Sequence, residues 1–182
     1  MRPFGLLLFM AFAMVKIHAQ PRPASAEQVM KDALVEARAE KKKLFIFFSA
    51  SWCSWCHAMD SAIHDPSCKN LFEAFYVIRK IDVKEEASKK YLENPGGAEM
   101  LRQYHGDSQG IPFWLIFDKD GELIADSQLR LPGQGLDQQG DNVGCPSTPK
   151  EIQYFTMILK QTSGLTNHEL KIIETRFGKT HD

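Results

Sequence analysis

A short apolar run that ends in two cysteines constrains the fold of this chain more than any other feature. Leu44–Phe48 is continuously hydrophobic, as in a strand buried on both faces, and the segment Trp52-Cys53-Ser54-Trp55-Cys56-His57 follows it. An Ile111-Pro112 pair lies downstream. Two cysteines at this spacing can close a small disulfide when the first lies at a helix N-terminus, where free N–H groups favour the Cys53 thiolate. The pattern predicts a strand-to-helix corner that carries a dithiol.

The first 19 residues have the pattern of a secretory signal peptide. Arg2 precedes an apolar run over residues 5–15, and Ala19 offers a small residue for cleavage. The run is much shorter than the ~20 apolar residues that span a bilayer, which favours a cleaved signal peptide over the alternative of an uncleaved anchor. We expect no stable membrane insertion after cleavage. The mature protein is therefore expected to be secreted or periplasmic.

Length and composition narrow the remaining possibilities. The 182 residues suffice for one well-packed domain, expected over residues 25–182 after a short leader at 20–24. Without Arg2 and Lys16, 20 basic residues remain against 23 acidic ones, a net charge near −3, so nucleic acid is not an expected partner. The histidines are not at metal-ligand spacing, and neither a metal nor a cofactor is predicted.

Hydrophobic periodicity and capping signals predict alternating helices and strands. Helical patterns extend over residues 26–42, from 53 to a break at Pro66, and over 71–75, 84–92, 98–104, 149–159 and 166–177. Strand patterns extend over residues 44–48, 76–83, 113–117 and 122–125. Capping boxes are expected at Ser25, Thr148 and Thr166. Residues 127–147, rich in glycine and polar residues, are expected to form a long loop.

This order of elements, with the C-x-x-C between the first strand and its helix, resembles the thioredoxin fold over residues 25–162. In that family a tryptophan commonly precedes the first cysteine, as Trp52 does here, and a cis-proline lies beside the disulfide, as Ile111-Pro112 would. The resemblance implies an α/β protein with a central mixed sheet flanked by helices. The loop 127–147 and a C-terminal helical extension at 163–177 would be additions to the minimal fold.

The resemblance also implies roles for the site residues. Cys53 would be the attacking cysteine, exposed at the start of the helix, and Cys56 the buried cysteine that resolves the mixed disulfide. The expected substrate-contacting residues are Trp52, Ile111 and Pro112, and the residues expected to modulate the site are Ser54, Trp55 and His57. The implied activity is that of a thiol:disulfide oxidoreductase that acts on protein thiols and disulfides and needs a redox partner to recycle its dithiol.

The sequence departs from the family pattern in three places. Thioredoxins carry a buried aspartate where this chain has Phe47, so the sequence does not identify a group that transfers protons to and from Cys56. The dipeptide between the cysteines is not the Gly-Pro of thioredoxin, which leaves both reduction and oxidation open, with reduction slightly favoured by analogy with small exported relatives. Cys68 and Cys145 have no family counterpart and are expected either to form a second disulfide or to stay as thiols, buried or exchanging with the site.

Three alternatives use the same residues differently. A thioredoxin-like module could hold client proteins without turnover. Cys53, Cys56 and His57 could instead bind a soft ion such as Cu(I) or Zn(II). The segment also satisfies C-x-x-C-H, the attachment signature of a c-type haem, although the preceding strand and the Ile-Pro pair have no role in that scheme.

Overall fold

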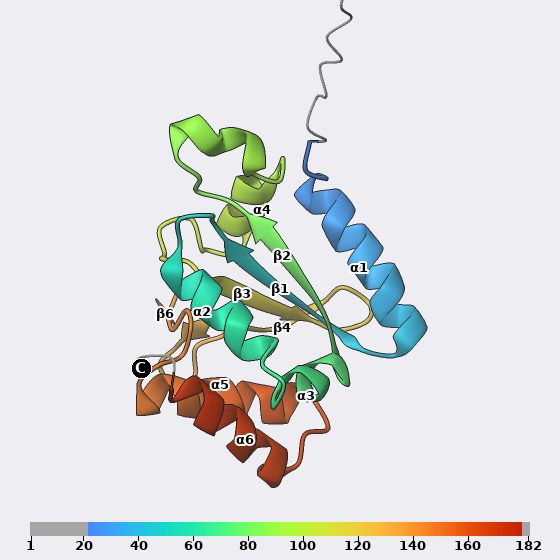
Figure 1. Ribbon diagram of the computed structural model, residues 1–182, viewed down its shortest axis with the longest axis vertical. Helices are drawn as coiled ribbons and strands as arrows, with labels where there is room; N and C mark the ends of the chain where they lie inside the picture. The colour runs from blue at the N-terminus through green and yellow to red at the C-terminus, as the bar shows by residue number, and fades with distance from the viewer. Residues whose placement is uncertain (1–21, 180–182) are drawn as a thin grey trace, which may run out of the picture.

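A four-stranded mixed sheet with the strand order β2-β1-β3-β4 forms the centre of the structure (Figure 1). This computed structural model describes residues 22–179, so the predicted signal peptide lies outside the described residues. The strands are β1 Lys43–Ser49, β2 Tyr76–Asp82, β3 Phe113–Phe117 and β4 Leu123–Asp126. Strand β1 pairs parallel to β2 and antiparallel to β3, and β3 pairs antiparallel to β4.

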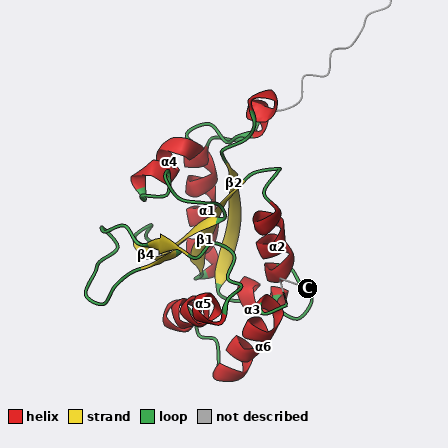
Figure 2. Ribbon diagram, turned by 90° about the vertical axis from the view of Figure 1, so that its left-hand side faces the viewer, coloured by secondary structure: helices red, strands yellow, loops and turns green. Residues whose placement is uncertain are grey.

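Helices cover both faces of this sheet. They are α1 Ala26–Glu40, α2 Ser54–Ile63, α3 Lys69–Glu73, α4 Gly97–Gln103, α5 Pro149–Thr162 and α6 Asn167–Phe177, with a 3₁₀-helix, η1, at Ala87–Leu92. One core cluster joins the sheet to α1 and α4, and the other joins it to α2, α3, α5 and α6. Figure 2 shows α2, α3 and α6 on the opposite side of the sheet from α4. The predicted α/β class, a mixed sheet flanked by helices, is confirmed.

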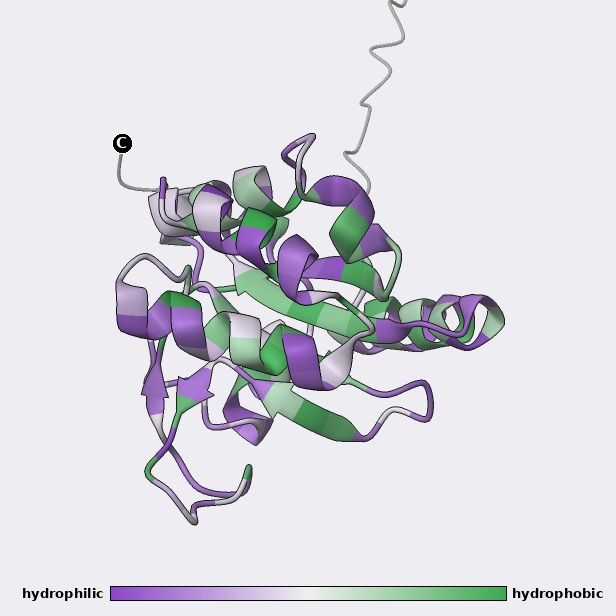
Figure 3. Ribbon diagram, turned by 90° about the horizontal axis from the view of Figure 1, so that it is seen from below, coloured by the Kyte–Doolittle hydropathy of each residue, from purple (hydrophilic) through white to green (hydrophobic). Residues whose placement is uncertain are grey.

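The apolar run in β1 fills both layers of the core. Phe45 and Phe47 face the α2 side, while Leu44, Ile46 and Phe48 face the α1 side. Because successive side chains of a strand point to opposite faces, a strand covered on both faces needs an uninterrupted apolar run. Figure 3 shows the strands of the central sheet coloured mostly as hydrophobic, whereas the helices around it alternate between hydrophobic and hydrophilic residues. β1 is therefore a rigid base for the residues that follow it.

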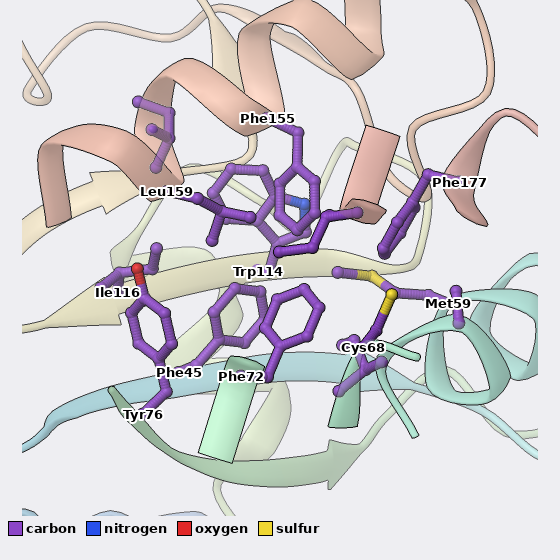
Figure 4. Packing of buried hydrophobic residues seen from close by; sticks show 14 of the residues in the cluster. Phe45, Met59, Cys68, Phe72, Tyr76, Trp114, Ile116, Phe155, Leu159 and Phe177 are labelled. Carbon is purple, nitrogen blue, oxygen red and sulfur yellow. The ribbon is translucent and has the colours of Figure 1, made fainter. Parts of the chain in front are cut away.

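An aromatic cluster on the α2 side ties the C-terminal extension to the fold (Figure 4). The ring centroid of Phe155 lies 5.4 Å from that of Trp114 and 5.0 Å from that of Phe177. Phe72 stacks on Phe155 at 6.3 Å. Such pairs contribute about 0.5–1.5 kcal/mol each beyond the area they bury. Helix α6 is thus part of the core.

The capping predictions are confirmed in their main features. Thr148 and Thr166 each accept a hydrogen bond from the backbone N–H three residues on, and the glutamate there bonds back to the cap. Ser25 caps α1 through Gln28 N–H, but the Gln28 side chain bonds Asp32 instead, so the third box is half formed. None of the helices within residues 22–179 has the length and apolar character needed to cross a bilayer.

Two predicted segments differ from the structure. Residues 84–92 form only the short η1, and residues 127–147 contain a second small sheet, β5 Gln128–Leu129 with β6 Asp141–Asn142. A buried ion pair at 2.6 Å between Arg130 Nη2 and Asp126 Oδ2 anchors this insertion. Residues 130–140 and 143–147 form loop as predicted, and the small sheet was not predicted because a buried polar contact, and not apolar periodicity, orders the insertion.

Candidate active site

The two cysteines of the C-x-x-C form a disulfide at the start of α2. Cys53 is the N-cap of the helix, and the S–S bond to Cys56 measures 2.04 Å. A turn links Cys53 to the end of β1, closed by a 3.0 Å hydrogen bond from Cys53 N–H to Ala50 O. The buried strand and the tight turn together fix where the first sulfur lies.

Backbone donors of α2 favour negative charge on Cys53. The N–H of Cys56 lies 3.1 Å from Cys53 Sγ, and the first turn of the helix holds no acidic residue. Free N–H groups and the helix dipole at an N-terminus stabilise an anion. When the disulfide is reduced, this arrangement lowers the free energy of the Cys53 thiolate relative to the thiol.

The predicted exposure of Cys53 was wrong for this disulfide form. Cys53 is 3% exposed and Cys56 is 1% exposed, and both pack with Ala50 in a small cluster against Ile111. A contact from a residue far along the chain covers the first sulfur, which the local sequence does not reveal.

The Ile111–Pro112 bond is cis, as predicted, and lies next to the disulfide. Cys53 Sγ lies 3.4 Å from Ile111 O, so a reduced Cys53 thiol would be in reach to donate to that carbonyl. Pro112 is itself buried, whereas Ile111 is half-buried. Of this pair, Ile111 is the residue that an incoming molecule can touch.

Two tryptophans form the outer surface of the site. Trp52 is 51% exposed and Trp55 is 41% exposed. The indole N–H of Trp52 donates to Lys84 O at 2.8 Å, which fixes its ring. Ser54 and His57 are also exposed, and His57 Nε2 lies 3.1 Å from Ser51 O.

Two residues after β2 were missed by the sequence reasoning. The buried Glu85 carboxylate accepts hydrogen bonds from Ser51, and the Lys84 ammonium group donates to the carbonyls of Asp107 and Gln109. The available signal was their position directly after a strand predicted next to β1. Carboxyl ends of parallel strands meet at one sheet edge, so residues there lie near the C-x-x-C.

A third missed residue is Asn142 of β6. Its side-chain amide donates to Gly110 O at 2.8 Å and to Pro112 O at 3.1 Å. The insertion therefore contacts the cis-proline loop from outside. Nothing in the local sequence around Asn142 indicates this contact, because it joins segments far apart in the chain.

Phe47 is buried in the core on the α2 side and has no carboxyl group, whereas Asp82 lies at the end of β2 and Glu85 lies just beyond it. Asp82 ends β2 beside Ser49 of β1, and burial raises the pKa of its carboxyl. Lys80 Nζ lies 3.6 Å from Asp82 Oδ1 and opposes that shift, while the charge of Glu85 adds to it. The site thus has acidic groups at its edge in place of one beneath the disulfide.

Cys68 and Cys145 are buried free thiols, so the second disulfide considered above is not formed. Both lie in the core cluster on the α2 side. Burial raises the pKa of both thiols, that of Cys145 to about 12. A thiol held neutral is a poor nucleophile toward disulfides, so we expect neither thiol to take part in exchange. The part of the chain that the structure describes also contains no group of three or more His, Cys, Asp or Glu side chains arranged to hold a metal.

Comparisons with known proteins agree with this geometry. A family model described as thioredoxin-like matches residues 25–119, which include both site cysteines, Trp52 and the Ile111–Pro112 bond. No curated protein matches the sequence.

Solved structures resemble the chain at low identity. A disulphide isomerase from Xylella fastidiosa Temecula1 has a TM-score of 0.46 and 24% identity, over 62% of this chain and 77% of that one. A DsbH oxidoreductase has a TM-score of 0.44 and 18% identity, over 86% of this chain and 92% of that one. The oxidised C-terminal domain of DsbD from Neisseria meningitidis has a TM-score of 0.45 and 16% identity, over 78% of this chain and 99% of that one.

Proposed function

The chain belongs to the thioredoxin-like family, and on that premise we propose that it is an exported enzyme that exchanges disulfides with protein substrates through Cys53 and Cys56. The thioredoxin-like fold with its C-x-x-C makes it a thiol:disulfide oxidoreductase. The observation that carries the proposal is the contact from Cys56 N–H to Cys53 Sγ at the start of α2. That contact favours the thiolate, which is the attacking form of cysteine.

The proposed reaction has two steps. The Cys53 thiolate attacks one sulfur of a substrate disulfide, which forms a mixed disulfide and releases the first substrate thiolate. The Cys56 thiolate then attacks Cys53 Sγ, which forms the Cys53–Cys56 disulfide and releases the second substrate thiolate. The substrate gains two electrons and the enzyme loses two. A separate redox partner returns the enzyme to the dithiol form.

The proposed substrate is an extended protein segment that carries a disulfide. Ile111 lies beside Cys53 and is half-buried, and Trp52 and Trp55 offer exposed apolar surface next to the two cysteines. An extended segment binds such a surface through main-chain hydrogen bonds and side-chain contacts. Ser54, Trp55 and His57 modulate the potential because they border the disulfide.

The proposed direction is reduction of partner proteins, by analogy with small exported thioredoxin-like proteins. Signal cleavage after residue 19 and a mature domain over 25–182 are part of the same proposal. An exported reductase depends on an electron donor because the surroundings are oxidising. The Ser54-Trp55 dipeptide between the cysteines is one of the features that set the potential.

Equilibration of the mature protein with glutathione or dithiothreitol buffers tests this function. We expect one reversible two-electron transition of Cys53 and Cys56 near thioredoxin's value of about −270 mV. A transition near about −120 mV would instead make the protein an oxidant. With Cys56→Ser, a substrate protein should stay attached to Cys53 as a mixed disulfide. The absence of any transition would contradict the proposal.

A further inference from the structure

The two residues Lys84 and Glu85, here called the Lys84–Glu85 segment, contact both halves of the redox site. They lie between β2, which ends at Asp82, and η1, which begins at Ala87. One half of the site is the turn that leads into Cys53, and the other is the loop 107–112 that ends in the cis-proline. These halves are far apart in the sequence, and the segment touches each of them through side-chain or backbone hydrogen bonds.

Glu85 holds the turn before Cys53. One carboxylate oxygen accepts from Ser51 N–H at 2.6 Å, and the other accepts from Ser51 Oγ at 2.8 Å. The residue is 4% exposed. A buried carboxylate is costly unless its oxygens are bonded, so this pair of contacts is a strong restraint on Ser51. Through Ser51 it restrains the Ala50–Cys53 turn.

Lys84 contacts the other half of the site, the loop 107–112. Its ammonium group donates to Gln109 O at 2.6 Å and to Asp107 O at 3.0 Å, just before the cis-proline loop. Its own carbonyl accepts from the Trp52 indole at 2.8 Å. One residue therefore links Trp52 to the loop that carries Ile111.

The backbone of Lys84 supports a functional interpretation of these contacts. Its φ of 55° lies in the left-handed region, where side chains other than glycine are uncommon. Such conformations persist where the surrounding contacts demand them, and they gather at functional sites. Here the left-handed turn lets the carbonyl of Lys84 face Trp52 while Glu85 faces Ser51.

We propose that Lys84 and Glu85 are positioning residues that hold the Cys53 turn and the cis-proline loop at their working separation. The inference rests on the proposed function and deepens it. Glu85 keeps Cys53 Sγ on the Cys56 N–H, and this restraint favours the Cys53 thiolate by more than the negative charge of Glu85 opposes it. Lys84 keeps Ile111 beside Cys53 and so favours substrate binding. The two residues act on the reaction through other groups and touch neither reacting sulfur.

The proposed effect of Glu85 on the Cys53 thiolate can be tested without a substrate. The reduced protein is treated with iodoacetamide across a pH series, and modification of Cys53 is followed by mass mapping. Glu85→Ala should slow alkylation at pH 7 about tenfold and move the midpoint of the profile to higher pH. Glu85→Gln should match or exceed the wild-type rate, because its amide can still accept from Ser51 N–H and donate to Ser51 Oγ while the negative charge that opposes the thiolate is removed. Glu86→Ala, an exposed neighbour, is the matched control.

Lys84 is tested with a small and a large disulfide. Lys84→Met should raise KM for reduction of insulin several-fold, because Ile111 is less well placed, and should leave the rate with a small aromatic disulfide near that of the wild type. Lys89→Met, an exposed lysine of η1, should match the wild type with both. A residue that served stability alone would change the melting temperature without this difference between substrates.

Two results would overturn the inference. One is a Cys53 alkylation profile of folded Glu85→Ala equal to that of Glu86→Ala, and the other is a Lys84→Met variant with an unchanged KM. If Glu85→Ala does not fold, Ser51→Ala removes only the hydroxyl contact and should shift the profile in the same direction by a smaller amount; no shift would again contradict the inference. The proposed function fails separately, if the wild type shows no reversible redox transition.

Discussion

The two pairs of cysteines in this protein could each form a disulfide, but they lie in different surroundings. Cys53 and Cys56 lie at a helix start with a backbone N–H aimed at Cys53 Sγ, and they form a disulfide. Cys68 and Cys145 lie in the apolar core and stay free thiols whose pKa values are raised by burial. All four cysteines are buried, so we expect the backbone donor at the start of α2, and not burial alone, to decide which pair reacts.

The two regions also differ in what stabilises them. The core around Cys68 is held by aromatic contacts such as Phe72 with Phe155. The site is held by polar contacts that span long sequence separations, such as Glu85 with Ser51 and Asn142 with Gly110. A change in the core should therefore alter stability, and a change at the site should alter reactivity.

The strongest test of this separation removes one cysteine from each pair. Cys53→Ser should abolish disulfide exchange, because the attacking thiolate is lost. Cys145→Ala should leave turnover within a factor of about two, because the buried free thiol of Cys145 takes no part in the proposed exchange. The measurement is reduction of insulin under one set of conditions. Comparable losses of insulin reduction in both variants would contradict the proposed difference between the two pairs of cysteines.

A core substitution should give the converse result. Phe155→Ala removes a fully buried ring and should lower the free energy of unfolding by about 3–5 kcal/mol. The reduction potential of Cys53 and Cys56, measured where the variant is still folded, should stay near that of the wild type. Urea unfolding and a glutathione titration provide the two values. A large shift in the potential would show that core and site are coupled.

The raised pKa of Cys145 predicts a smaller, pH-dependent effect. Its pKa is about 12 in the folded protein against an ordinary value of 9.0, chiefly because of burial. A thiol with a raised pKa contributes stability that is full below pH 9 and is lost as the pH rises toward 12. Relative to Cys145→Ala, the wild type should lose about 1 kcal/mol by pH 10.

Urea unfolding at pH 8 and at pH 10 checks this expectation. The difference in unfolding free energy between the wild type and Cys145→Ala should narrow at the higher pH. Curves that stay parallel would mean that the Cys145 thiol ionises as easily in the folded protein as in the unfolded chain. The environment of the core thiols would then need another description.

The sequence predicted those parts of the molecule that depend on local patterns. The apolar run of β1, the two complete capping boxes and the cis bond at Ile111–Pro112 are confirmed. These features follow from periodicity, caps and a motif that lie within short windows. The central sheet and both helical layers follow from them.

The parts that could not be predicted depend on contacts between distant segments. Cys53 is covered by Ile111, and the insertion is ordered by the buried ion pair of Asp126 with Arg130. Glu85 and Lys84 act on residues in other loops. In the sequence they look like ordinary charged residues after a strand, and only the parallel pairing of β1 with β2 places them at the site.

The most direct test of the proposed redox site measures the redox form of all four cysteines across a series of glutathione potentials. Each sample is alkylated in the native state, and the redox form of each cysteine is read by mass spectrometry. The account predicts that Cys53 and Cys56 change together in one two-electron transition while Cys68 and Cys145 stay as unmodified thiols throughout. A transition shared by Cys68 and Cys145, or none at Cys53 and Cys56, would contradict it.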